Sequence, residues 1–132
     1  MYRFLSTTVF NVFRYPITME KTAGPYTPVV RSGNWIIVSG QIGHLDGVLV
    51  EGGLEPQLRQ LFANLKRLLE SENATLQNVL KTTVFLTDID DYGHMNEIYT
   101  DEFEGHRPAR SAIAVAALPL GALIEIEAWA KL

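Results

Sequence analysis

The chain has 132 residues, enough for one compact domain that folds without disulfides or a structural metal. It is 47% hydrophobic and 20% charged, like an ordinary globular protein, and it lacks cysteine, which excludes disulfides, thiol nucleophiles and cysteine-based zinc sites. No apolar run reaches the ~20 residues that span a bilayer, so no membrane segment is expected. The net charge of −4 argues against nucleic-acid binding, which relies on Lys and Arg, and we expect a cytoplasmic protein.

The first segment, residues 1–16, holds five aromatic residues, two arginines and no acid. Three interpretations of it stay open. It is an N-terminal strand built on residues such as Val12 and Phe13, a transit-type leader, or sequence upstream of a start at Met19. We treat it as an atypical extension of a single domain that covers residues 1–132.

The next elements are short strands followed by one long helix. Residues 29–31 give a short strand signal, and the continuous apolar run at 35–39 predicts a strand buried on both faces. Asp46-Gly47 is a strong signal for a two-residue hairpin turn. Over residues 54–70 apolar side chains recur every three or four positions with charged residues opposite, which predicts an amphipathic helix.

The second half of the chain predicts a strand, a second helix and two further strands. Residues 79–87 are rich in β-branched side chains, and Asp88 offers a cap for a helix that runs to about Phe103, with Tyr92 on its inward face. A helix between strands indicates a crossover and therefore a mixed sheet. The two later strands are expected at residues 111–117 and 122–131.

The last of these strands contains two acids in an otherwise apolar run. Because strand residues two apart share a face, Leu123, Glu125, Glu127 and Trp129 point one way and the intervening residues the other. One interpretation is a solvated face. The other is a partly buried carboxylate with a chemical role, since buried carboxylates are rare unless they are paired.

A second candidate is Arg110, which opens a strand of small residues that leave room around its guanidinium. Arginine binds carboxylates through two parallel hydrogen bonds, although an arginine at this position also suits an exposed charge or a structural salt bridge. The three histidines lack metal-ligand spacing, and the sequence has neither a nucleophile elbow nor a phosphate-binding loop.

Several short motifs occur together in one order. They are GPY at 24–26, SGQI at 39–42, KTTVFL at 81–86, Asn96 and Tyr99, RPARS at 107–111 and IEIEA at 124–128. With these motifs, residues 22–132 resemble the RidA/YjgF family of imine deaminases. The resemblance implies an α+β fold like that of the trimeric chorismate mutases, with two helices on one face of a mixed sheet. It also implies a homotrimer with its sites in clefts between subunits.

The family resemblance also implies a reaction, the hydrolysis of 2-imino acids or enamines to 2-oxo acids and ammonia. Arg110 would then hold the substrate carboxylate and Glu125 would position or activate water, while Tyr26, Ser39 and Asn96 would line the pocket. No cofactor, metal, nucleic acid or membrane is implied. The alternatives are a non-catalytic small-molecule-binding or protein-interaction (chaperone) module and a chorismate mutase on the same scaffold.

The sequence departs from the family pattern at several places around the implied pocket. Ala112 stands where many members have cysteine, and Thr27-Pro28 replaces a common Ser-Gln pair. The segments after Gln41 and before Arg110 are shorter than usual. The expected substrate preference is therefore open.

Overall fold

The structure is a computed structural model that describes residues 13–14, 22 and 24–132. The interpretations of residues 1–16 therefore lie outside the described residues, except that Phe13–Arg14 form a short strand, β1. The predicted start at Met19 also lies outside them. None of the helices in the described part of the chain has the length and apolar character needed to cross a bilayer.

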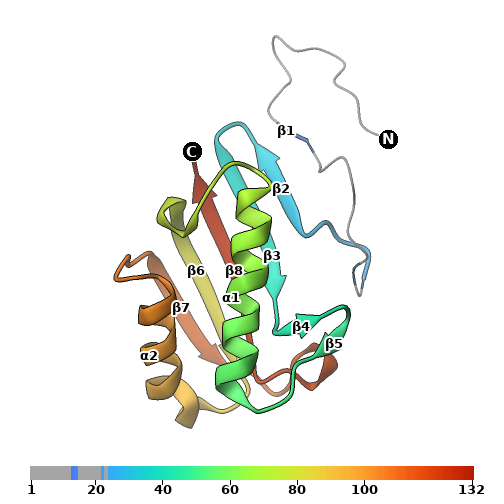
Figure 1. The fold of residues 1–132 in the computed structure, drawn as a ribbon, viewed down its shortest axis with the longest axis vertical. Helices are drawn as coiled ribbons and strands as arrows, with labels where there is room; N and C mark the ends of the chain where they lie inside the picture. Colours follow the sequence, from blue (N-terminus) through green and yellow to red (C-terminus); the bar gives the residue numbers. More distant parts are fainter. Residues whose placement is uncertain (1–12, 15–21, 23) are drawn as a thin grey trace.

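A six-stranded mixed sheet forms the centre of the fold, in the order β1-β2-β3-β8-β6-β7 (Figure 1). Neighbouring strands are antiparallel except for β6 and β7, which are parallel and joined through the second helix. A separate hairpin turns at Asp46-Gly47, as predicted. The strands are β2 Val29–Ser32, β3 Trp35–Gln41, β4 His44–Leu45, β5 Val48–Leu49, β6 Val79–Leu86, β7 Ala109–Ala114 and β8 Ile124–Lys131.

Two helices, α1 (Leu54–Glu70) and α2 (Tyr92–Glu102), cover the same face of this sheet (Figure 1). The predicted α+β architecture is therefore confirmed. Three single-turn 3-10 helices, η1 (Leu76–Asn78), η2 (Ile89–Asp91) and η3 (Pro119–Gly121), complete the connections. The core lies between sheet and helices and includes Ile36, Val38, Leu58, Leu61, Phe62, Leu65, Val84, Leu86, Phe103, Ile124 and Ile126.

The other side of the sheet, which we call the open face, is covered by no helix of the described residues. The prediction that residues 35–39 are buried on both sides is wrong for this reason: Ile36 and Val38 face the helices, whereas Trp35 is 38% exposed. Trp35 and Trp129 meet edge to face on the open face, with ring centroids 6.1 Å apart. The strands predicted at residues 111–117 and 122–131 both exist, as β7 and β8, although their ends differ from the prediction.

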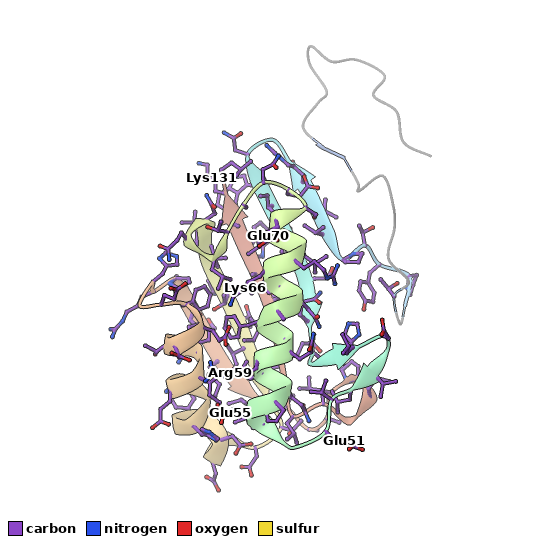
Figure 2. All side chains as sticks on the ribbon, viewed as in Figure 1. Glu51, Glu55, Arg59, Lys66, Glu70 and Lys131 are labelled. Carbon is purple, nitrogen blue, oxygen red and sulfur yellow. The ribbon has the colours of Figure 1, made fainter. Side chains whose placement is uncertain are left out.

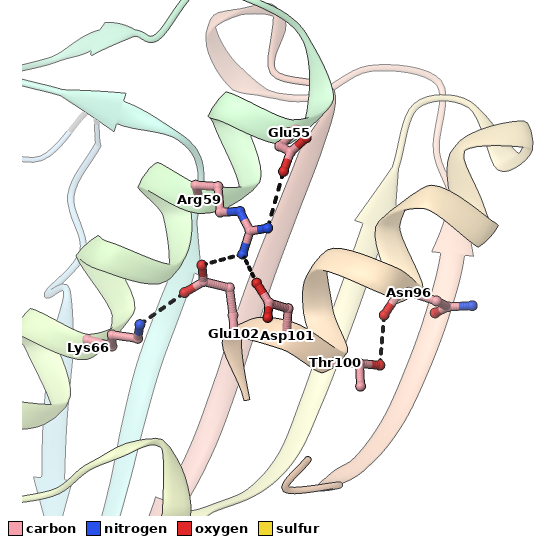
Figure 3. A network of polar contacts seen from close by, with 7 residues as sticks. All are labelled: Glu55, Arg59, Lys66, Asn96, Thr100, Asp101 and Glu102. Atoms are coloured by element: carbon pink, nitrogen blue, oxygen red, sulfur yellow. Dashed lines mark hydrogen bonds and ion pairs between the residues drawn. The ribbon is translucent and has the colours of Figure 1, made fainter. Parts of the chain in front are cut away.

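Charged side chains hold the two helices together along their solvent side. Arg59 of α1 lies one turn after Glu55 and contacts it (Figure 2). Arg59 also reaches Asp101 at 2.6 Å and Glu102 at 2.8 Å on α2 (Figure 3). Lys66 contacts the second oxygen of Glu102 at 2.9 Å. Arg59 is thus a structural arginine, with its charge fully matched by nearby carboxylates.

Candidate active site

A cavity of about 570 Å³ opens beside the end of β3, within reach of three of the predicted site residues. Tyr26, Ser39 and Glu125 all line it, although they come from three separate segments of the chain. Its volume is in the range of ordinary small-molecule sites. The other lining residues are Thr22, Pro28, Gly40, Gln41, Ile42, His44, Gly47, Pro119 and Leu120.

Glu125 enters this cavity because of the alternation along β8. Its neighbours Ile124 and Ile126 are fully buried under the helices, so the Glu125 carboxylate points to the opposite side of the sheet. Glu125 is only half-exposed, and it forms no ion pair with any described residue. Burial, and to a lesser extent the charge of Glu127, raises the pKa of this carboxyl above its ordinary value. Such a group can exchange a proton with a bound reactant.

An irregularity in the sheet makes room for this carboxylate. Val38 pairs with Ala128 and Gln41 with Ile126, so β3 has one residue more than β8 between these pairs, a β-bulge. A Cβ on Gly40, within the bulge, would overlap the Glu125 carboxylate and lie 2.8 Å from its Cδ. Sequence analysis missed the role of Gly40; a glycine inside a strand is the signal that could have indicated it.

Hydrogen bonds fix the segment that carries Tyr26 to the same strand. The Ser39 hydroxyl donates to the Thr27 carbonyl at 2.6 Å, and the Ser39 amide donates to the Pro28 carbonyl at 2.9 Å. Tyr26 itself is 46% exposed, so its ring stays accessible at the edge of the cavity. The predicted Ser39 therefore acts first as an anchor for the cavity wall.

The opposite wall of the cavity is anchored to helix α1. Gly43 packs so closely on this helix that a Cβ there would overlap the backbone of Gln57, 2.7 Å from its carbonyl carbon. The Asn64 amide donates to the carbonyls of Ile42 at 3.2 Å and His44 at 3.0 Å. The loop at the cavity is thus rigidly attached to the core.

Arg110 lies away from this cavity, on the helix side of the sheet. Its partner in the parallel register is Thr82, a fully buried residue, and its guanidinium packs against α2. The guanidinium carbon lies 4.8 Å from the Tyr99 ring centroid, and Nη2 donates to the Tyr92 hydroxyl at 3.0 Å. Nη1 contacts the Met95 sulfur at 3.8 Å.

The charge of Arg110 is unmatched, in contrast to that of Arg59. Arg110 is only half-exposed, and no carboxylate of the described residues forms an ion pair with it. A guanidinium held between two aromatic rings with most of its donors unused is suited to bind an anion. The interpretation of Arg110 as a structural salt bridge is therefore not supported.

Asn96 lies on α2, the helix whose residues contact Arg110. It points away from the ion pairs of Arg59 (Figure 3). Its backbone carbonyl accepts a hydrogen bond from Thr100 at 2.8 Å, whereas its side-chain Oδ1 is buried without a partner among the described residues. An unsatisfied buried acceptor is uncommon in proteins. The fold of one chain does not explain why this oxygen is left without a partner.

One chain therefore does not bring all predicted site residues together. Glu125 pairs with Phe85 and Arg110 with Thr82, and β6 residues three apart face opposite sides of the sheet. Tyr26, Ser39 and Glu125 form one group, at the cavity, and Arg110 with Asn96 forms another, beside α2. Among the described residues, no group of three or more acidic or histidine side chains is placed to hold a metal ion.

Comparison with known proteins gives a consistent family. The family model described as "Endoribonuclease L-PSP" matches residues 17–132. A protein of Rattus norvegicus named 2-iminobutanoate/2-iminopropanoate deaminase is 48% identical over 125 residues, which cover 91% of each chain. Other similar proteins are named as mitochondrial in Saccharomyces cerevisiae and as chloroplastic in Arabidopsis thaliana.

Solved structures agree with this result. RidA from the Antarctic bacterium Psychrobacter sp. is similar with a TM-score of 0.84 and 35% identity, covering 90% of this chain and all of that one. Escherichia coli TdcF with bound serine is similar with a TM-score of 0.82 and 31% identity, over 90% of this chain and 98% of that one. On the evidence of its motifs, its fold and these matches, the chain belongs to the endoribonuclease L-PSP family, also known as RidA/YjgF.

Proposed function

We propose that the protein is a hydrolase that converts 2-imino acids, such as 2-iminopropanoate and 2-iminobutanoate, to 2-oxo acids and ammonia. The observation that carries the proposal is a pair of opposite, half-buried charges, Arg110 and Glu125, neither of which has an ion-pair partner among the described residues. A 2-imino acid needs both a cation for its carboxylate and an acid–base group near its C=N bond. The names of the relatives as deaminases point the same way.

The two groups of residues belong to different copies of the chain in this proposal. Among the described residues, an acid but no arginine or lysine lines the cavity of one copy, whereas a second copy offers the cation of Arg110 together with Asn96, whose Oδ1 has no partner. Closed symmetric assembly brings such complementary patches together. A homotrimer with three sites between subunits, as the family resemblance implies, is the assembly we propose.

The chemistry needs only positioning and proton transfer. Arg110 holds the carboxylate and so orients C2 of the imine toward a water beside Glu125. Water adds to C2 as its proton passes to Glu125, which returns the proton to the nitrogen and gives a carbinolamine. The carbinolamine hydroxyl then passes its proton by the same carboxyl to the nitrogen, ammonia leaves, and the C2–O bond becomes the carbonyl. The raised pKa of Glu125 suits a group that both accepts and returns a proton.

The test is release of 2-oxo acid and ammonia from freshly generated 2-iminobutanoate. We expect wild type to exceed the uncatalysed rate and Arg110→Ala to lose about 10- to 100-fold in kcat/KM, because a charge-assisted hydrogen-bonded contact is worth about 1.5–3 kcal/mol. Arg107→Ala is the matched control, since this arginine is exposed and only three residues away. Equal rates for wild type, Arg110→Ala and buffer would overturn the proposal.

A non-catalytic small-molecule binder remains the second candidate, favoured by the similarity to TdcF with bound serine. Saturable binding of 2-oxobutanoate without turnover of the imine would support it.

RNA cleavage, the activity in the description of the family model, is tested in parallel with a defined single-stranded RNA. The negative net charge argues that this RNA stays intact. A cytoplasmic location also stays a prediction.

A further inference from the structure

The hydroxyl of Tyr92 lies beside the guanidinium of Arg110 at the surface of the protein. It accepts a hydrogen bond from Nη2 of Arg110 at 3.0 Å, and the guanidinium carbon lies 5.5 Å from the Tyr92 ring centroid. Sequence periodicity predicts that Tyr92 faces the core, but the side chain is 41% exposed. Tyr92 is the first residue of α2, where the helix extends beyond the core it covers.

The hydrogen of the Tyr92 hydroxyl is still available for another contact. A phenol offers one O–H donor besides its acceptor positions, and no described residue accepts from Tyr92. Accepting a bond from a cation polarises the phenol and makes its own O–H a better donor. Tyr92 and Arg110 thus present donors from one place, and no carboxylate of the described residues forms an ion pair with Arg110.

A second tyrosine on the same helix shows the opposite arrangement. The Tyr99 ring also packs on Arg110, but its hydroxyl is buried and hydrogen-bonded to Thr82 at 2.6 Å. Burial raises the pKa of the Tyr99 phenol, which therefore stays protonated and serves the core. The fold gains little from a comparable bond at the exposed Tyr92, because water competes for both partners there.

We propose that Tyr92 is a second binding residue for the substrate carboxylate: it accepts from Arg110 and donates its hydroxyl hydrogen to the anion that Arg110 holds. This inference rests on the proposed function, because it needs a carboxylate at Arg110. The Tyr92 hydroxyl adds one donor to those of the guanidinium, so the carboxylate receives a further hydrogen bond from a fixed direction. The contact is the same for every 2-imino acid, whatever its side chain.

The test is the substitution Tyr92→Phe, which keeps the ring on Arg110 and removes only the hydroxyl. We expect the Kd of 2-oxobutanoate, measured by calorimetric titration, to rise about 3- to 10-fold, the range for one ordinary hydrogen bond, because water competes with the contact at this partly exposed site. The KM for 2-iminobutanoate rises by a similar factor with kcat unchanged, since the carboxylate keeps its charge through the reaction. The affinity for pyruvate, which has a shorter side chain than 2-oxobutanoate, falls by the same factor.

Three comparisons make the result decisive. Glu97→Gln, at an exposed position of the same helix, controls for surface changes on α2. Melting temperatures of both variants show that the fold is intact. Wild-type affinity in Tyr92→Phe, or different factors for pyruvate and 2-oxobutanoate, overturns the inference while the proposed function stands. Absence of binding and turnover in wild type overturns the proposed function itself.

Discussion

At the scale of single residues, two charges with similar exposure have different relations to the fold. Arg59 is matched by three carboxylates and joins two helices, whereas the described residues that hold Arg110 offer it aromatic rings, a hydroxyl and a sulfur but no carboxylate. Glu125 likewise lies in a partly buried place without a cation. Charges left unmatched in this way lower the stability of the folded chain and are typical of binding sites.

The raised pKa of Glu125 predicts how the stability of the folded chain changes with pH. Because the folded chain holds this proton more tightly than the unfolded chain, stability falls as pH rises from the ordinary pKa near 4.5 through the folded value. We therefore expect Glu125→Gln to melt at a higher temperature than wild type at neutral pH, and the difference to shrink toward acid pH. Thermal melts across this range check it, and a lower melting temperature for Glu125→Gln at neutral pH would contradict it.

At the scale of elements, the cavity depends on how closely its loop approaches helix α1. Gly43 contacts the backbone of Gln57 where no side chain fits, and the Gln57 side chain accepts a hydrogen bond from the Leu123 amide at 2.9 Å. One helix residue thus connects the loop after β3 to the start of β8. Both segments supply cavity residues, so α1 positions the site from behind.

Two glycine-to-alanine substitutions in different elements should have opposite effects on stability. Gly43→Ala forces α1 and the loop apart and is expected to lower the free energy of unfolding by about 1–3 kcal/mol. Gly93→Ala, in the first turn of α2 with open space around it, should raise it by up to about 1 kcal/mol through helix propensity. Urea denaturation measures both. A neutral Gly43→Ala would mean that the loop moves freely from the helix.

Sequence patterns predicted the elements with one buried face best. The amphipathic spacing at 54–70 and the alternation around Glu125 each follow from a single apolar side, so helix α1 and the outward acid were predicted correctly. The side of the sheet that Arg110 faces was not predictable, because the small residues after it give no alternation. The bulge at Gly40 depends on pairing with β8, which one segment alone does not reveal.

At the scale of the whole molecule, the residues proposed for one site are divided between two sides of the sheet. In the homotrimer proposed above, one copy presents its helix side to the cavity of another, and the cavity group then meets the Arg110 group. In the proposed assembly, Arg110 and Glu125 of a given site belong to two different chains. Their substitutions are therefore separable by mixing.

Co-expression of Arg110→Ala and Glu125→Gln chains should restore activity that each variant lacks alone. In random mixed assemblies about one quarter of the sites combine an intact Arg110 with an intact Glu125, half times half, if they come from different copies. The measurement is imine hydrolysis by the purified mixture, with mass analysis of the assembly to show that both chains are present. Mixed assemblies without recovered activity would place both residues in one chain's site or in none.

The parallel pairing of β6 with β7 has a consequence for engineering. Because α2 connects these two strands, Tyr92, Asn96 and Arg110 all lie in one uninterrupted stretch, residues 79–114, whereas the cavity draws on residues from 22 to 47 and from 119 to 125. The side chains proposed to hold the substrate anion can thus be exchanged between relatives as one continuous segment. Chimeras joined at the two ends of this segment are expected to exchange the proposed anion binding, while the cavity around Glu125 keeps its own sequence.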